Sequence, residues 1–139
     1  MIRGVGTDLV SIERISAALE RSGDRFIQRV LHPVEIAVMP AGPAQAAWVA
    51  KRWAAKEAAA KALGTGIGAS ASLTDFAVVS GPAGEPRLQV EGKAAATAGE
   101  GAHWHLSLSD DGGFAQAFTV LSHNANAVRH LGQRTNAFD

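Results

Sequence analysis

A glutamate and a lysine lie one helical turn apart in segment 53–66, an alanine-rich run that ends at glycines. Residues four apart on an α-helix share a face, so Glu57 could hold a divalent cation while Lys61 meets the oxygens of a phosphate group. This spacing indicates phosphate chemistry. The alternative is an ordinary solvent-exposed ion pair, which stabilises a helix by roughly 0.3–0.5 kcal/mol. The helix alone does not decide between the two interpretations.

A second acid that could bind a metal, Asp8, follows a short apolar run at the N-terminus. The run predicts a β-strand that ends at Asp8 and leads into a helix, for which Ser11 is a suitable N-cap. Folds that combine strands with helices tend to place ligand-facing side chains at strand ends, which makes Asp8 a candidate metal ligand. An Asp between a strand and a helix is also common as a turn or capping residue.

The third segment of interest, residues 103–121, contains two alternating apolar runs joined by Asp-Asp-Gly-Gly. Asp-Gly and Gly-Gly provide the positive φ values that a tight reversal requires, so the segment predicts a β-hairpin with an acidic turn. His103 and His105 share one face of its first strand, a spacing compatible with metal binding. Without a third ligand of similar clarity, we interpret both histidines as structural or solvent-facing.

These three segments, in this order, resemble the 4′-phosphopantetheinyl transferases, and among them the bacterial holo-[acyl-carrier-protein] synthase group. The resemblance covers residues 1–121. Each motif is weak by itself, but the ordered set is specific. The motifs are Gly4-Val-Gly6-Thr-Asp8-Leu-Val followed by Arg14, then Arg52-Trp53-Ala-Ala-Lys56-Glu57-Ala with Lys61-Ala-Leu-Gly64-Thr-Gly66, and finally Leu106-Ser-Leu-Ser109.

The resemblance implies a magnesium-dependent enzyme that transfers the 4′-phosphopantetheine arm of coenzyme A to a serine hydroxyl of an acyl carrier protein and releases adenosine 3′,5′-bisphosphate. We expect Asp8 and Glu57 to bind Mg²⁺ through one oxygen each, and Lys61 to neutralise a phosphate oxygen. The serine proton passes either to Glu57 or to a water on the metal. The residues expected to contact coenzyme A are Arg52, Lys56, Lys61, Gly64, Gly66, Pro86, Ser109 and Asp110.

The glycines of loop 64–68 do not form a P-loop, because they follow the helix and Lys61, whereas the glycines of a P-loop precede its helix. Gly64 is well placed as the C-terminal cap of the helix. Two roles remain open for Gly64 and Gly66. They either bring backbone and free amide groups close to coenzyme A, or they simply terminate the helix.

Asp110 departs from the family pattern. After the Ser-Leu-Ser run, the resembling proteins usually carry a histidine that meets phosphates of coenzyme A. A carboxylate repels phosphate where an imidazolium attracts it. Asp110 therefore turns away from the phosphates, works through a cation, or weakens the binding of coenzyme A.

The expected protein partner is an acyl carrier protein, and carrier proteins are acidic. Arg14, Arg21 and Arg25 recur at helix-like spacing near the first motif, which predicts a docking surface in keeping with the family's use of its first helix. Because acidic residues lie among these arginines, a solvated face of mixed charge is the alternative. The resemblance further implies a homotrimer with its active sites at the subunit boundaries.

Composition excludes several other classes. The chain has 139 residues and zero formal net charge, so no global field attracts nucleic acid or an anionic membrane. Its 47% hydrophobic and 19% charged content indicates one small folded domain. The absence of cysteine excludes disulfides, a thiol nucleophile and zinc sites built on sulfur. No apolar run has the length of a signal peptide or membrane span, so we expect a cytoplasmic protein.

The predicted elements are a first strand and helix, a long helix over 44–63, strands over 74–79 and 87–90, a short helix over 92–99, and the hairpin. This order indicates an α+β domain in which an antiparallel sheet carries helices on one side, with the long helix packed on it. We assign residues 1–121 to the domain and residues 122–139 to a polar tail. His123 and His130, in that tail, are expected to be solvated.

Two further functions fit the same residues. One is a binding module for coenzyme A and a carrier protein that has lost turnover, an alternative that rests on Asp110. The other is a magnesium-dependent hydrolase of nucleotide pyrophosphates, in which water replaces the carrier serine as the acceptor.

Overall fold

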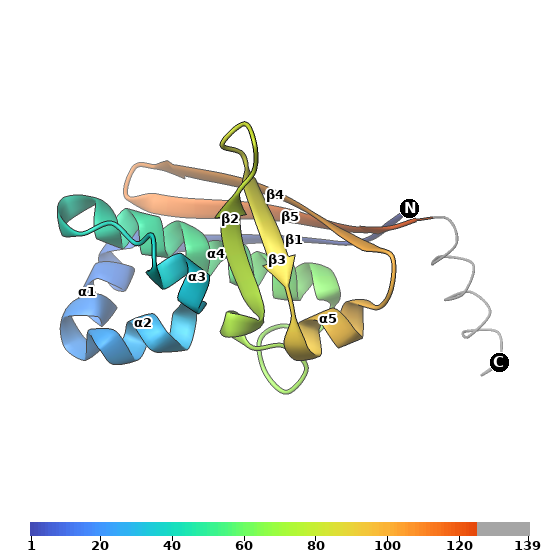
Figure 1. The fold of residues 1–139 in the computed structure, drawn as a ribbon. Helices are drawn as coiled ribbons and strands as arrows, with labels where there is room; N and C mark the ends of the chain where they lie inside the picture. The colour runs from blue at the N-terminus through green and yellow to red at the C-terminus, as the bar shows by residue number, and fades with distance from the viewer. Residues whose placement is uncertain (125–139) are drawn as a thin grey trace.

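The computed structural model describes residues 1–124 as an α+β fold (Figure 1), which confirms the predicted fold class. A three-stranded antiparallel sheet has the strand order β1-β5-β4, and two further strands, β2 and β3, form a small antiparallel sheet. The strands are β1 (Ile2–Ser11), β2 (Phe76–Ser80), β3 (Pro86–Val90), β4 (Ala102–Asp111) and β5 (Phe114–His123). The helices are α1 (Ile12–Ser22), α2 (Asp24–Val30), α3 (Pro33–Ile36), α4 (Gln45–Leu63) and α5 (Gly92–Ala98), with short 3₁₀ turns at Gly42–Ala44 and Leu73–Asp75.

The long helix α4 lies against one face of the three-stranded sheet. Small residues on both sides permit this close contact. Ala58 and Ala62 of α4 are buried, and a Cβ atom built on Gly6 would lie 1.9 Å from the carbonyl oxygen of Ala58. The same holds for Gly4 and the carbonyl oxygen of Ala62. These two glycines of the first motif therefore fix the distance between β1 and α4, and with it the position of Asp8 relative to Glu57 and Lys61.

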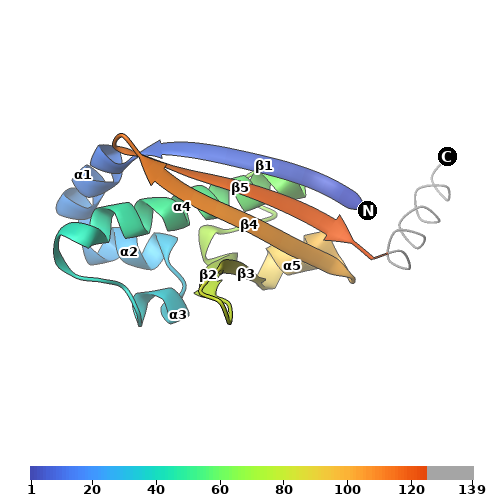
Figure 2. The ribbon, with the colours of Figure 1, turned by 90° about the horizontal axis from the view of Figure 1, so that it is seen from above.

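The opposite face of the sheet is not covered by any element in the described part of the chain, as the view in Figure 2 shows. Large apolar side chains of β1 and β5 are exposed there, among them Val5, Leu9 and Phe118. Phe118 pairs with Thr7 in the ladder between the two strands, so these side chains lie close together on the outer face. An uncovered apolar face of this kind is typical of an interaction surface.

The structure confirms the predicted helix caps and the predicted hairpin turn. Ser11 caps α1, and its side chain accepts a hydrogen bond from the amide of Arg14. Gly64 ends α4 in the left-handed conformation, with φ of 89°. In the hairpin, Gly112 and Gly113 both have positive φ, at 58° and 83°. Local residue chemistry is thus sufficient to predict these ends and turns.

Several boundaries differ from the prediction. β1 does not end at Asp8 but continues to Ser11, because it pairs with β5 as far as Phe114. The strand predicted from residue 74 begins at Phe76, after a 3₁₀ turn.

The last strand also continues two residues into the segment that we assign to the polar tail. β5 extends to His123, whose backbone amide donates to the carbonyl of Met1. The His123 side chain is not solvated but buried, and its Nε2 lies 2.7 Å from the carbonyl oxygen of Ala98. His130 lies outside the described residues. Within the described residues, no helix is long and apolar enough to cross a membrane.

Candidate active site

The first group of predicted residues lies where α4 passes the β1 edge of the sheet. The Lys61 ammonium group donates to the backbone carbonyl of Thr7, at 2.9 Å, and to the Asp8 carboxylate, at 3.3 Å. The Asp8 side chain is only 17% exposed, whereas that of Lys61 is 53% exposed. Asp8 thus holds the Lys61 ammonium group in a position where solvent and a phosphate can reach it.

Glu57 completes this group, and its electrostatics resemble those of a metal ligand. Burial raises the pKa of the Glu57 carboxyl, and the nearby charge of Asp8 raises it further, against the lowering effects of Lys61 and Arg14. Asp8 and Glu57 are therefore close enough to repel each other. A cation bound by both carboxylates would relieve this repulsion.

The donor set fits magnesium. Magnesium is usually bound by one or two carboxylates, with water and substrate phosphates as the remaining ligands. Within the described residues there is no cluster of three or more His, Cys, Asp or Glu side chains that could enclose a metal ion. Two carboxylates beside an exposed lysine suit a site that is shared with a phosphate substrate.

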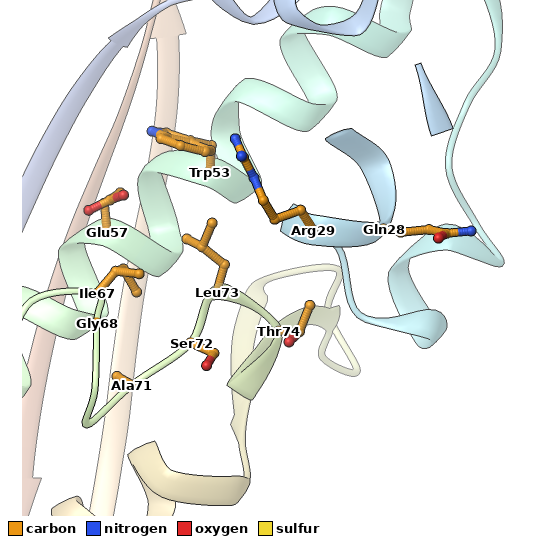
Figure 3. Close-up of a pocket in the computed structure, with 10 residues that line it drawn as sticks. All are labelled: Gln28, Arg29, Trp53, Glu57, Ile67, Gly68, Ala71, Ser72, Leu73 and Thr74. Carbon is orange, nitrogen blue, oxygen red and sulfur yellow. The ribbon is translucent and has the colours of Figure 1, made fainter. Parts of the chain in front are cut away.

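A cavity of about 530 Å³ opens next to Glu57 (Figure 3). Trp53 and Glu57 form its α4 side, Gln28 and Arg29 extend from α2, and the loop after α4 supplies the remaining wall. The Trp53 ring stacks against Phe26, with ring centroids 6.0 Å apart, so Trp53 is a wall residue with a fixed orientation. No sequence motif contains Arg29, so its place at this cavity was not predicted. The loop residues that line the cavity are Ile67, Gly68, Ala71, Ser72, Leu73 and Thr74, of which the first two belong to the glycine loop 64–68.

A second cavity, of about 220 Å³, brings together three residues that were predicted to contact coenzyme A: Arg52, Pro86 and Asp110. Lys51, which was not predicted, also lines it, and the Lys51 Nζ lies 3.2 Å from Oδ1 of Asp110. Of the three alternatives for Asp110, the structure supports an interaction with a cation. That cation is supplied by the chain itself.

Arg52 is held in place in this second cavity. Its guanidinium lies 3.8 Å from the centroid of the Trp48 ring and donates to the Trp48 carbonyl at 3.2 Å. Burial lowers the pKa of Arg52, an effect opposed by the charge of Glu35. The buried Nε has no hydrogen-bond partner among the described residues. Arg52 is therefore an oriented cation with donor capacity left for a ligand.

The two groups lie on opposite flanks of α4. β1 and β4 are the two edges of the sheet with β5 between them, so Asp8 and Asp110 belong to opposite edges. Lys61 and Arg52 are nine residues apart on α4, which places them about 180° apart around the helix. The two cavities share no lining residue. In one chain, the predicted residues thus form two half-sites separated by α4.

Lys56 is a correction to the sequence analysis. Its side chain is fully buried, and its ammonium group donates to the carbonyl oxygens of Val30 and Phe76 and to the carboxylate of Glu35, at 2.5 Å. All three donors are used inside the protein. The prediction that Lys56 contacts phosphates of coenzyme A is wrong, because the residue faces the core and neutralises a buried acid.

Gly64, Gly66 and Ser109, which were also predicted to contact coenzyme A, line neither cavity. The amide of Gly64 bonds to the carbonyl of Lys61, and that of Gly66 to the carbonyl of Ala60, so both close the helix and neither is free to donate. This favours helix termination over an amide cradle. Ser109 lies on the opposite face of β4 from Asp110, because side chains alternate along a strand, and it is exposed on the outer face of the sheet.

The three arginines predicted to dock a carrier protein are exposed. Arg14 and Arg21 lie on α1 and Arg25 lies on α2. Arg14 is close enough to Glu57 to lower the pKa of its carboxyl. One end of this group of arginines therefore lies next to the half-site that contains Glu57.

The amino-acid sequence of the chain is similar to those of known proteins. Residues 4–120 match the model of the 4′-phosphopantetheinyl transferase superfamily. A holo-[acyl-carrier-protein] synthase of Halorhodospira halophila is 48% identical over 123 residues, which cover 87% of this chain and 98% of that protein.

Solved structures are similar as well. The holo-[acyl-carrier-protein] synthase of Neisseria meningitidis superposes with a TM-score of 0.81 at 35% identity, over 88% of this chain and 99% of that one. The synthase of Bacillus anthracis, in complex with coenzyme A (3′,5′-ADP), gives 0.77 at 36% identity, over 89% and 99% of the two chains.

Proposed function

Because the chain belongs to the 4′-phosphopantetheinyl transferase superfamily, we propose that it moves the 4′-phosphopantetheine arm of coenzyme A to a serine of an acyl carrier protein in the cytoplasm. The reaction depends on magnesium and releases adenosine 3′,5′-bisphosphate. The observation that carries this proposal is the group at the β1 edge, where Lys61 is held by Asp8 beside the Glu57 carboxylate. Phosphoryl transfer needs such positioned charge more than it needs covalent chemistry from the protein.

The three residues of this group would bind the metal, neutralise the phosphate and accept the serine proton between them. Asp8 and Glu57 would hold magnesium, which when bound neutralises charge on the pyrophosphate of coenzyme A. The Lys61 ammonium group lies beside Asp8 and would neutralise a phosphate oxygen as charge shifts during the transfer. Glu57, whose carboxyl pKa is raised by burial, is suited to accept the proton that the carrier serine loses.

The second cavity is proposed as the site for the nucleotide part of coenzyme A. Arg52 offers an oriented guanidinium for a phosphate, and Pro86 forms part of a wall against which the adenine can pack. Synthases of Bacillus anthracis and Helicobacter pylori have been solved in complex with coenzyme A, which supports coenzyme A as the ligand.

The separation of the two half-sites supports an oligomer with shared active sites, for which the family resemblance implies a homotrimer. Asp8 lies at one edge of the sheet and Arg52 flanks the other, with α4 between them. If the β1 edge of one subunit meets the β4 edge of the next, the half-sites complete each other across the boundary. The uncovered apolar face formed by Val5, Leu9 and Phe118 supplies a surface for that association.

The carrier protein would dock on Arg14, Arg21 and Arg25. These arginines are exposed, and Arg14 is the one that lies near Glu57. An acidic helix bound along them would therefore bring its serine close to the reacting phosphate.

The test measures adenosine 3′,5′-bisphosphate release from coenzyme A with and without an apo acyl carrier protein, and with a chelator in place of magnesium. A transferase releases the product only when carrier and magnesium are both present. Asp8→Ala and Glu57→Ala are expected to abolish release while circular dichroism shows an intact fold, and Glu13→Ala, an exposed acid on α1, serves as the control. Release without carrier protein would instead support a hydrolase, and full activity of either alanine variant would refute the metal assignment.

A further inference from the structure

We propose that Lys51 is the second phosphate-binding residue of the nucleotide cavity, and that Asp110 holds its ammonium group at the cavity until a phosphate arrives. The inference rests on the proposed function, because it takes the nucleotide part of coenzyme A as the occupant. The sequence motifs had assigned phosphate binding to other residues and not to Lys51.

Lys51 lies where a second phosphate-binding residue is needed. Lys51 directly precedes Arg52 on α4, and both residues line the cavity of about 220 Å³ together with Asp110 of β4. The Lys51 Nζ lies 3.2 Å from Oδ1 of Asp110, so the ammonium group lies at the wall of the cavity and not in bulk solvent. Trp48 fixes the neighbouring Arg52 through stacking and a hydrogen bond. The cavity thus contains one fixed cation and one cation on a flexible stem.

The net charge of the cavity depends on Lys51. Without Lys51, the charges of Arg52 and Asp110 cancel, and the cavity would not attract a phosphate dianion. Lys56 cannot contribute, because it is buried against Glu35. Lys51 leaves the three residues with one net positive charge, and the anion then has two cations within the same cavity. Asp110 is tolerated next to a phosphate site because Lys51 compensates for it.

The ion pair between Lys51 and Asp110 is able to rearrange. The side chains of Lys51 and Asp110 are 30% and 42% exposed, and a partly exposed lysine–carboxylate pair is weak. A phosphate dianion competes well with one carboxylate for the same ammonium group. Lysine has three donors on a flexible stem, so Lys51 can bond to the phosphate without leaving Asp110 completely.

Isothermal titration calorimetry with 3′,5′-ADP and with adenosine tests the proposal, because neither ligand requires magnesium or a carrier protein. Lys51→Met is expected to weaken 3′,5′-ADP binding about tenfold, the loss of one charge-assisted hydrogen bond, and to leave adenosine binding unchanged. Asp110→Asn is expected to tighten 3′,5′-ADP binding, because it removes a like charge and frees the ammonium group. Lys93→Met, which removes an exposed lysine on α5, is the matched control and should bind as the unaltered protein does.

The double variant Lys51→Met/Asp110→Asn separates direct contact from mere neutralisation of Asp110. If Lys51 contacts the phosphate, the double variant binds clearly more weakly than Asp110→Asn alone. Equal binding by these two variants would overturn the proposal, as would an effect of Lys51→Met below twofold or weaker binding by Asp110→Asn. A complete lack of 3′,5′-ADP binding by the unaltered protein would overturn the proposed nucleotide site and this inference together. Normal binding with no effect of Lys51→Met would overturn this inference alone.

Discussion

At the scale of single residues, Glu57 joins the chemistry of the site to the stability of the protein. Burial and the charge of Asp8 both raise the pKa of its carboxyl above the ordinary value of 4.5. The folded protein therefore holds the Glu57 proton more tightly than the unfolded chain does. As the pH rises past the ordinary value, the unfolded chain ionises more readily, so Glu57 lowers the stability of the metal-free protein at neutral pH.

The variant Glu57→Gln tests this coupling. In the presence of a chelator, it should be at least as stable as the unaltered protein at pH 7, and the difference should disappear below about pH 4.5, where the acid is protonated in both states. Added magnesium should raise the thermal midpoint of the unaltered protein and not that of the variant. Thermal unfolding between pH 4 and pH 7.5 is the measurement, with Glu13→Gln as an exposed control. A variant that is less stable at pH 7 in chelator and still responds to magnesium would contradict this account of Glu57.

Residue motifs predicted much of the candidate site, but they did not predict which side chains face inward. Arg52, Pro86 and Asp110 come together in one cavity as expected, and Asp8 lies with Lys61. Lys56 stands in the same motif as Arg52 and Glu57, yet it points into the core. Its direction depends on where α3 and β2 pack on α4, and this long-range information is absent from a local motif.

At the scale of elements, one buried acid holds four segments together. Glu35 of α3 accepts hydrogen bonds from the amides of His32 and Val78 and from the ammonium group of Lys56. Lys56 in turn bonds to the carbonyl at the end of α2 and to that of Phe76 in β2. The pair thereby fixes α2, α3 and β2 on α4, next to Arg52 and Glu57.

A double-mutant cycle on Glu35 and Lys56 measures this interaction. Glu35→Gln and Lys56→Met each leave one buried charge without its partner and should each cost about 3–5 kcal/mol in the free energy of unfolding. The double variant should lose much less than the sum, because no unpaired charge remains. Urea unfolding followed by circular dichroism gives the three values. Additive losses would show that the two side chains act independently.

Close contact between β1 and α4 provides a second prediction about elements. A Cβ atom on Gly6 would lie 1.9 Å from the Ala58 carbonyl oxygen, so Gly6→Ala must push the strand away from the helix. We expect a loss of about 1–3 kcal/mol in stability, together with impaired transfer, because Asp8 moves relative to Lys61. Gly68→Ala, where no heavy atom lies within 4 Å of the new Cβ, is the stability control. If Gly6→Ala unfolds at the same urea concentration as the control, the close packing does not set this distance.

Element ends with local signals were predictable, and ends set by distant pairing were not. Ser11, Gly64 and the glycines of the hairpin mark their boundaries through capping and φ preferences. β1 continues past Asp8 because β5, more than a hundred residues later, pairs with it as far as Ser11. For the same reason, the burial of His123 could not be deduced from the polar composition around it.

At the scale of the whole molecule, the arrangement of the two half-sites indicates how the subunits would work together. The carboxylates and Lys61 flank α4 on the β1 side, whereas the cavity proposed for the nucleotide lies on the β4 side. An isolated chain would offer coenzyme A only one half-site at a time. Association through the uncovered face of the sheet would therefore be a condition for activity.

Phe118→Glu tests that condition. Phe118 is 49% exposed at the centre of the outer face, so a glutamate there should disrupt association without unfolding the subunit. Light scattering after gel filtration should show a change from trimer to monomer, and transfer activity should fall with it. Val38→Glu replaces another exposed apolar residue, 71% exposed and away from the sheet, and should change neither property. An active Phe118→Glu monomer would contradict the shared site.

Transfer of a phosphopantetheine arm to a carrier protein can be followed by intact mass spectrometry of the carrier itself. An apo acyl carrier protein is incubated with the protein, coenzyme A and magnesium, and in parallel with a chelator. We expect the carrier to gain the mass of one phosphopantetheine, about 340 Da, and to lose this gain with chelator and with the Glu57→Ala variant. No mass gain on any of several carrier proteins, despite measured binding of coenzyme A, would contradict the claim.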